Sequence, residues 1–163
     1  MPACLLDVNV WLAAAFPAHP AHDSSQKVLL EATPGTPALF CRATQQSFLR
    51  LVSTPTIFNA YRSEPITNRD ALSALAAFAA LPQVDLIDEP AGLETLWWRL
   101  AGLEEPAPKR WLDAYLAAFA ISGSLRMISL DRDFQQFIGA GLHLVLLRVD
   151  AGSVEGGADP CWD

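Results

Sequence analysis

Cysteine, positive charge and long apolar runs are all scarce in this 163-residue sequence. The three cysteines, Cys4, Cys41 and Cys161, lie far apart and form no Cys-x-x-Cys pair, which argues against a zinc site and fits unpaired thiols in a reducing cytoplasm. No apolar run reaches the ~20 residues that a membrane-spanning helix needs. The first residues form no basic segment, so we expect a cytoplasmic protein without a signal peptide.

Charged residues are also few, and the basic ones are outnumbered. There are 11 Lys and Arg against 18 Asp and Glu, which gives a net charge of −7. Proteins that bind nucleic acid usually carry a basic surface, so the charge total by itself speaks against such a partner. The 52% hydrophobic content excludes a disordered or fibrous chain and is sufficient for a domain with its own core.

The C-terminal end differs in composition from the rest of the chain. Residues 151–163 (AGSVEGGADPCWD) are rich in glycine, acidic and without apolar periodicity. We therefore expect one folded domain over residues 1–150, followed by a flexible acidic tail over 151–163.

Short apolar runs alternate with segments of helical periodicity. The runs are too short for helices and mostly do not alternate with polar residues, which is typical of parallel strands covered on both faces. They are Ala3–Leu6, Ala38–Cys41, Val84–Ile87, Arg126–Leu130 and His143–Val149. Apolar residues recur at helical spacing within 25–32, 72–79 and 93–100. This alternation predicts an α/β fold with a mainly parallel sheet.

Local signals suggest where some of the helices begin and end. Thr67 and Asp70 have the spacing of a capping box, in which each side chain accepts a hydrogen bond from the other residue's backbone. Gly123 and Gly139 are expected to end helices.

Three acidic residues stand beside apolar sequence. Asp7 and Asp131 each follow a predicted buried strand, and ligands of open α/β sheets bind at that edge. Either residue could instead cap the helix that comes next. Asp113 borders the apolar face of the predicted helix 111–120, where an unpaired carboxylate is costly. Its alternative explanation is a first-turn acid that the helix dipole favours.

Carboxylates that converge without His or Cys are hard oxygen ligands. Such ligands suit Mg²⁺ or Mn²⁺, and the corresponding chemistry is metal-assisted hydrolysis of phosphodiester bonds. The sequence contains no GxxxxGK[ST], GxGxxG, GxSxG or HExxH motif, so other familiar catalytic arrangements are missing. The carboxylates are therefore the candidate catalytic groups.

Four segments, in this order, resemble the signature blocks of the PIN domain and in particular of VapC-type ribonuclease toxins from prokaryotic toxin–antitoxin pairs. They are LLDVNVWLA (5–13), TQQSFLRLVSTP (44–55), WLDAYLAAFA (111–120) and SLDRDF (129–134). The resemblance implies a Rossmann-like, three-layer α/β/α sandwich with a central, mainly parallel sheet. It also implies Mg²⁺- or Mn²⁺-dependent cleavage of RNA, a homodimer, and inhibition by a cognate VapB-like antitoxin.

The resemblance also implies roles for individual residues. The positions that match the family's acids are Asp7, Asp113 and Asp131, with Asp133 as an additional acid of the last block. Asn9 and Ser129 match polar positions near the first and last of these acids, and Asn9 would orient Asp7 as an outer-shell group.

One acid of the family pattern is missing. The family usually has Glu three residues after a Thr such as Thr44, and this position is Ser47 here. Serine can order water or contact phosphate, but it contributes no charge. The resemblance therefore predicts weaker metal binding and leaves open whether the site holds one ion or two.

RNA binding beside an acidic pocket requires nearby cations. Lys109 and Arg110 precede Asp113, and Arg132 lies between two of the acids, so these three cations are the candidate RNA-binding residues. Trp111 could stack on an unpaired base. Each of these side chains is also compatible with an ordinary surface or core role.

Two other functions stay open at this point. The missing acid at Ser47 is compatible with a catalytically silent PIN scaffold that binds antitoxin or RNA without cleavage. A phosphatase that uses Asp7 as phospho-acceptor is the third reading, although Asn9 stands where the common Asp-x-Asp arrangement has its second acid.

Overall fold

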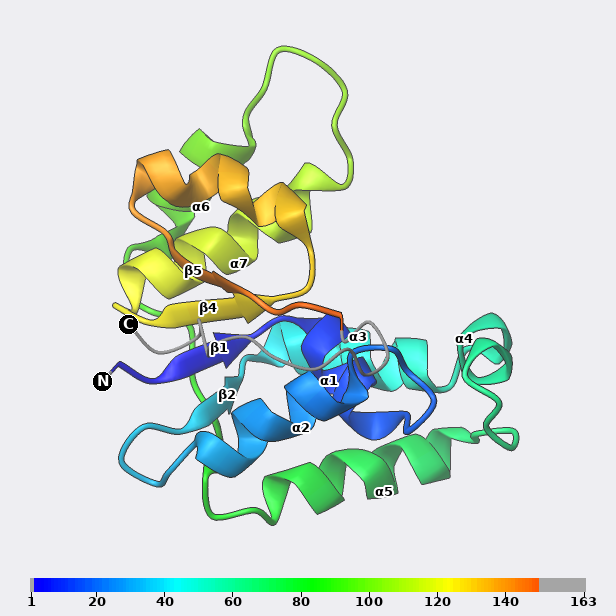
Figure 1. Ribbon diagram of the computed structural model, residues 1–163. Coiled ribbons are helices and arrows are strands. Elements are labelled where there is room, and N and C mark those ends of the chain that lie inside the picture. Colours follow the sequence, from blue (N-terminus) through cyan, green and yellow to red (C-terminus); the bar gives the residue numbers. More distant parts are fainter. Residues whose placement is uncertain (1, 150–163) are drawn as a thin grey trace.

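Five short parallel strands form one sheet in the order β3-β2-β1-β4-β5 in the computed structural model, which describes residues 2–149 (Figure 1). The strands are β1 (Cys4–Leu6), β2 (Ala38–Phe40), β3 (Val84–Leu86), β4 (Arg126–Ser129) and β5 (His143–Leu146). All five predicted strands are confirmed, with ends shifted by up to three residues. The chain builds the sheet outward from β1 on one side and later returns to β4 on the other.

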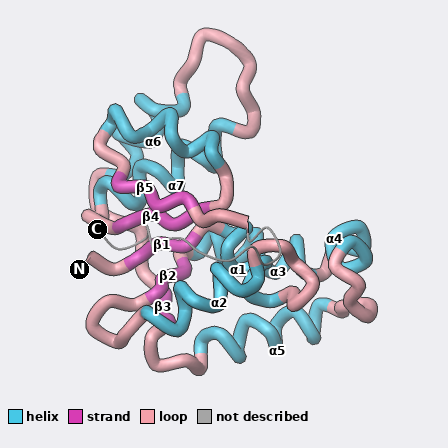
Figure 2. The backbone as a smooth tube through the Cα atoms, viewed as in Figure 1, coloured by secondary structure: helices cyan, strands magenta, loops and turns pink. Residues whose placement is uncertain are grey.

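Helices connect the strands and cover both faces of the sheet (Figure 2). They are α1 (Val8–Ala15), α2 (His22–Glu31), α3 (Arg42–Val52), α4 (Pro55–Ala60), α5 (Asn68–Ala79), α6 (Leu93–Ala101), α7 (Arg110–Ser122) and the 3₁₀ helix η1 (Arg132–Ala140). Helices α6, α7 and η1 lie on one face, and α1, α2, α3 and α5 lie on the other (Figure 1). This is the predicted α/β/α sandwich.

The sheet separates two hydrophobic cores, because successive strand residues point to opposite faces. Leu5 and Met127 pack with residues of α6 and α7, whereas Leu6 and Ile128 pack with residues of α1 and α3. Burial on both faces explains why the strand sequences are apolar at nearly every position and do not alternate.

Trp11 of α1 is the largest side chain fully buried in the core on the α1 side. Its ring stacks on Phe40 of β2, with ring centroids 3.6 Å apart and planes 9° apart, and Phe78 of α5 meets it edge-on at 5.2 Å. These contacts fix α1 against the sheet. Because α1 begins directly after β1, they also fix the end of β1 where Asp7 lies.

Local signals define some helix ends correctly and one incorrectly. The capping box is confirmed, because Asp70 N–H donates to Thr67 Oγ1 at 3.1 Å and Thr67 N–H donates to Asp70 Oδ2 at 2.8 Å. Gly123 ends α7 as predicted. The prediction for Gly139 is wrong, because η1 runs past it and ends at Gly141, whose φ of 103° is the left-handed conformation that glycine adopts most easily.

Some sequence predictions concern residues that the structure does not describe. The predicted tail, 151–163, lies outside the described residues, as does Cys161. Cys4 and Cys41 are both free thiols, as expected. Within residues 2–149, no helix has the length and apolar character needed to cross a membrane.

Replacing Trp11 by alanine is expected to lower the free energy of unfolding by about 3–5 kcal/mol, because it leaves a cavity between α1 and β2. Urea unfolding followed by circular dichroism measures this loss. The matched control is Trp98→Ala on α6, where the side chain is 56% exposed and the expected change is within about 0.5 kcal/mol. Equal losses in the two variants would contradict the importance of the Trp11 stack.

Candidate active site

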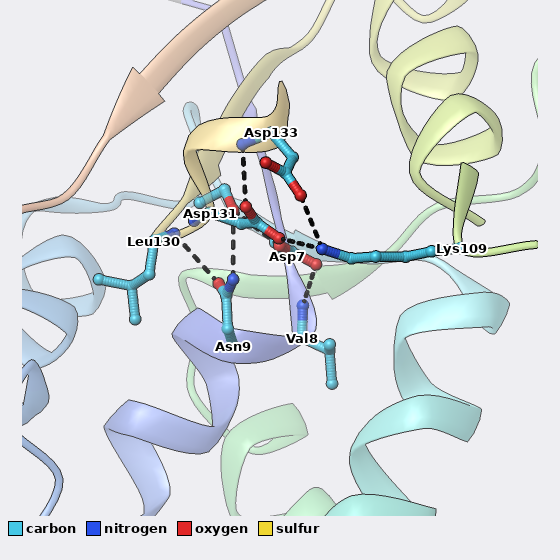
Figure 3. Close-up of polar contacts among 8 residues, drawn as sticks. Asp7, Val8, Asn9, Lys109, Leu130, Asp131 and Asp133 are labelled. Atoms are coloured by element: carbon cyan, nitrogen blue, oxygen red, sulfur yellow. Dashed lines mark hydrogen bonds and ion pairs between the residues drawn. The ribbon is translucent and has the colours of Figure 1, made fainter. Parts of the chain in front are cut away.

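Three of the predicted acids, Asp7, Asp131 and Asp133, gather where the strand order reverses, at the carboxyl ends of β1 and β4 (Figure 3). Leu6 pairs with Ile128 in the parallel register, and the N–H of Asp7 donates to the carbonyl of Ile128 at 2.9 Å. The connections after β1 and β4 leave toward opposite faces of the sheet, which opens a crevice at this edge. The sheet therefore brings Asp7 and Asp131 together, although they are far apart in the sequence.

Asp7 is buried, with 5% of its surface exposed, and it caps α1. Its Oδ1 accepts a hydrogen bond from Val8 N–H at 2.7 Å, and its Oδ2 accepts one from the Ser129 hydroxyl at 2.7 Å. Burial, followed by the charges of Asp113 and Asp131, raises the pKa of Asp7 to about 6 in spite of these hydrogen bonds. Asp7 is thus both a helix cap and a member of an acidic cluster.

Ser129, the last residue of β4, is fully buried and connects Asp7 at the end of β1 to Asp131. Its hydroxyl donates to Asp7 and accepts from Asp131 N–H at 2.9 Å and from the Asn9 amide at 3.3 Å. The Asn9 carbonyl oxygen accepts from Leu130 N–H at 3.2 Å. Since the donor and both acceptor positions of Ser129 are used, the serine holds Asp7 and the start of η1 in one arrangement.

Asp131 caps η1 and shares a cation with Asp133 (Figure 3). Asp131 Oδ1 accepts from Asp133 N–H at 2.9 Å. Lys109 Nζ donates to Asp131 Oδ2 at 3.1 Å and to Asp133 Oδ2 at 2.8 Å. Partial burial acts to raise the pKa of Asp131, but the Asp133 N–H and the Lys109 ammonium outweigh it and lower that pKa. Hydrogen bonds to Asp133 and Asp131 raise the pKa of Lys109.

Asp113 joins the cluster from the first turn of α7. Its carboxyl group is half-buried, and this burial is the main reason why its pKa is raised. The charges of Asp131 and Asp133 act in the same direction, while Lys109 acts in the opposite one. Acids from three parts of the fold, the end of β1, α7 and the segment after β4, therefore make one another harder to ionise.

The other predicted cations lie in different surroundings. The Arg110 side chain contacts other parts of the protein. Its Nε donates to the Leu100 carbonyl at 2.7 Å and its Nη1 donates to Gln136 Oε1. Its guanidinium lies 5.0 Å from the centre of the Phe137 ring. It thus joins α6, α7 and η1. Arg132 is exposed at the first residue of η1.

A cleft of about 330 Å³ adjoins the acids. Lys109, Asp113 and Asp133 line it together with Glu105 and Gln136. Glu105 lies in a polar turn and Gln136 lies just beyond the last signature block, so the sequence alone singles out neither residue. Only the path of the chain between α6 and α7 brings Glu105 to the cleft.

The chemistry of these side chains suits a hard divalent cation. Mg²⁺ and Mn²⁺ prefer carboxylate oxygen, keep several waters, and would relieve the repulsion between Asp7, Asp113 and Asp131. In the described part of the chain, no three His, Cys, Asp or Glu side chains are already arranged to hold a metal ion directly. Ser47 lies half-buried on α3 and adds no carboxylate. An ion bound by these carboxylates would therefore keep part of its water shell.

Comparison with known proteins agrees with this fold and with the family resemblance. Residues 4–139 match the family model of the PIN domain. Ribonuclease VapC41 of Mycobacterium tuberculosis, from strain CDC 1551 / Oshkosh and from strain ATCC 25618 / H37Rv, is 44% identical over 142 residues, which are 86% of this chain and 97% of that protein.

Solved structures share the fold at lower identity. VapC20 of Mycobacterium tuberculosis, a Sarcin-Ricin loop cleaving toxin, is 18% identical with a TM-score of 0.59, over 90% of this chain and 99% of that one. VapBC2 from Rickettsia felis, bound to a DNA fragment from its promoter, is 14% identical with a TM-score of 0.58, over 88% of this chain and 98% of that one. VapBC-1 from nontypeable Haemophilus influenzae is 13% identical with a TM-score of 0.61, over 88% of this chain and 97% of that one. The resemblance carried by the four sequence blocks is confirmed, and the chain belongs to the PIN-domain family and, within it, to the VapC proteins.

Proposed function

We propose that this VapC protein is a metal-dependent endoribonuclease, the toxin of a toxin–antitoxin pair, in which Asp7, Asp113 and Asp131 hold Mg²⁺ or Mn²⁺. The observation that carries the proposal is the placement of Asp7 and Asp131 on the same serine hydroxyl at the carboxyl ends of β1 and β4, with the charge of Asp113 acting on Asp7. The 44% identity to ribonuclease VapC41 supports RNA as the substrate.

The side chains of the protein prepare this chemistry in separate ways. The hydrogen bonds from Val8 and Ser129 fix the Asp7 carboxylate, and the Asp133 N–H fixes that of Asp131. Asp113 is only half-buried, so it faces the side from which a large substrate has to approach. A bound divalent ion would lower the pKa of a water molecule and neutralise charge on the phosphate.

Exposed cations next to the acids would guide the RNA. Lys109 and Arg132 are both exposed, and a phosphate oxygen is a suitable acceptor for either. Arg110 contributes more through the α6–α7–η1 packing that holds the cleft, because its guanidinium already has protein partners.

The proposed partners are a VapB-like antitoxin and a second copy of this chain, acting in the cytoplasm. The similarity to the VapBC2 and VapBC-1 structures supports an antitoxin of the VapB type. The homodimer rests on the family resemblance alone.

The variant Asp113→Asn is expected to lose RNA cleavage by at least about 100-fold, because several kcal/mol of metal-derived stabilisation is removed. Cleavage of a structured RNA in Mg²⁺ measures the effect, and circular dichroism checks the fold. The control is Asp23→Asn, which changes an exposed acid in the first turn of α2 in the same way and is expected to leave cleavage unchanged. Cleavage by Asp113→Asn within about threefold of wild type would overturn the proposed role of the acid.

Removal of divalent metal is expected to abolish cleavage, and Mn²⁺ or Mg²⁺ is expected to restore it. The test is an EDTA-treated protein titrated with each ion while RNA cleavage is followed. Wild-type protein that binds RNA but does not cut it at any Mn²⁺ concentration would instead fit the catalytically silent scaffold that Ser47 in place of an acid leaves open.

Asp7→Asn is expected to inactivate the enzyme and yet stabilise the metal-free fold. The pKa of Asp7 is raised from 3.8 to about 6 in the folded state, so the folded state binds its proton more tightly than the unfolded state does. This destabilises the fold by about 3 kcal/mol above pH 6, and the destabilisation disappears as the pH falls toward 4. Asparagine carries no charge and keeps an acceptor for Val8 N–H, but its amide group replaces the oxygen that accepts from the Ser129 hydroxyl, which reduces the gain by about 1 kcal/mol.

Urea unfolding in EDTA at pH 7.5 and at pH 4.5 measures this effect. The gain in Asp7→Asn should be present at pH 7.5 and much smaller at pH 4.5, whereas Asp23→Asn should behave as wild type at both. A less stable Asp7→Asn protein at pH 7.5 would contradict the cost of keeping the buried Asp7 carboxylate ionised, to which burial contributes most and the neighbouring acids add.

A further inference from the structure

Lys109 places a positive charge directly on the proposed metal site. Its Nζ lies 3.1 Å from Asp131 Oδ2 and 2.8 Å from Asp133 Oδ2 (Figure 3). The lysine stands immediately before α7, the helix that carries Asp113. One side chain therefore bridges Asp131 and Asp133, and its charge also acts on Asp113.

We infer that Lys109 is an exchangeable counter-ion of this site. In the metal-free protein its ammonium neutralises Asp131 and Asp133, and a divalent ion has to displace it from Asp131. The inference rests on the proposed function, because it requires Asp131 to bind the ion. It adds a competition, inside the chain, between a lysine and the metal.

The hydrogen bonds of Asp131 explain why the two cations compete. Asp131 Oδ1 already accepts the N–H of Asp133, which is part of the cap of η1. Lys109 occupies Oδ2, the other oxygen of this carboxylate. An ammonium and a divalent ion repel each other strongly at ligand distances, so they cannot share this oxygen.

The exposure of Lys109 makes the exchange inexpensive in free energy. Its side chain is 67% exposed, and exposed ion pairs contribute only about 1 kcal/mol or less. The cleft of about 330 Å³ that Lys109 lines with Asp113 and Asp133 gives the released ammonium a place beside the substrate path. There it is available for a phosphate oxygen of the RNA.

The test measures Mn²⁺ binding by calorimetry, without RNA. Lys109→Gln is expected to bind Mn²⁺ about three- to tenfold more tightly than wild type, because one competing ion pair and one repelling charge are removed. Lys109→Arg keeps the charge and is expected to bind Mn²⁺ as wild type does. The matched control is Arg132→Gln, which also removes one charge next to Asp131.

The control separates contact from net charge. Within residues 2–149, the Arg132 guanidinium forms no ion pair with these acids, so Arg132→Gln is expected to change Mn²⁺ affinity by less than about twofold. Equal gains in Arg132→Gln and Lys109→Gln would overturn the inference, since net charge alone would then explain the affinity.

A spectroscopic measurement on the wild-type protein follows the lysine itself. The ¹⁵N signal of the Lys109 ammonium should be detectable in EDTA, because two carboxylates hold its protons, and it should shift and broaden when Mg²⁺ is added. A signal that Mg²⁺ leaves unchanged, at concentrations where calorimetry shows binding, would overturn the displacement.

The outcomes also distinguish this inference from the proposed function. If Lys109→Gln binds Mn²⁺ no more tightly than wild type while Asp113→Asn has lost cleavage, the nuclease stands and the counter-ion role fails. If wild-type protein binds no Mn²⁺, the proposed function fails and the inference fails with it.

Discussion

The burial of the Asp7 carboxylate at the carboxyl ends of two parallel strands, β1 and β4, is the constraint on which the rest of the site depends. A buried carboxylate is tolerated only with hydrogen bonds and, if ionised, with a compensating cation. Val8 N–H and the Ser129 hydroxyl supply the hydrogen bonds. These hydrogen bonds lower the pKa of Asp7 by less than burial raises it, so the pKa is about 6. The negative charge is thus held in place by the fold while its neutralisation is left to another partner.

The fold holds these repelling acids because its cores are rigid on both sides of the sheet. Trp11, stacked on Phe40, fixes α1, and Arg110 fixes the start of α7 against α6 and η1. Both helices begin beside the site. Stability gained in the two cores therefore offsets the cost of a buried, ionised carboxylate among like charges at the site, which is a common relation between the stability of an enzyme and its activity.

The sequence predicts those parts of the structure that local signals determine. Short apolar runs identified the five strands, and the positions of Asp7 and Asp131 after two of them indicated an edge of the sheet. That β1 pairs with β4 depends on contacts between residues more than 120 positions apart, such as the Ser129–Asp7 hydrogen bond, and no local pattern contains it. The same holds for Lys109 and Arg110, neighbours in sequence whose side chains have unlike partners. At Gly139 the local rule failed because η1 continues to a second glycine.

The net charge of −7 is a poor guide to RNA binding, because it adds the acids of the proposed metal site to the charged side chains elsewhere on the surface. Asp7, Asp113, Asp131 and Asp133 belong to a site in which a divalent ion would cancel two of their four charges. On the counter-ion mechanism the same ion also frees the Lys109 ammonium. Metal binding then changes the local charge twice, once by its own charge and once by releasing a lysine toward the cleft. An acidic protein can thus attract a phosphate at one point without a broad basic surface, and only when the metal needed for cleavage is present.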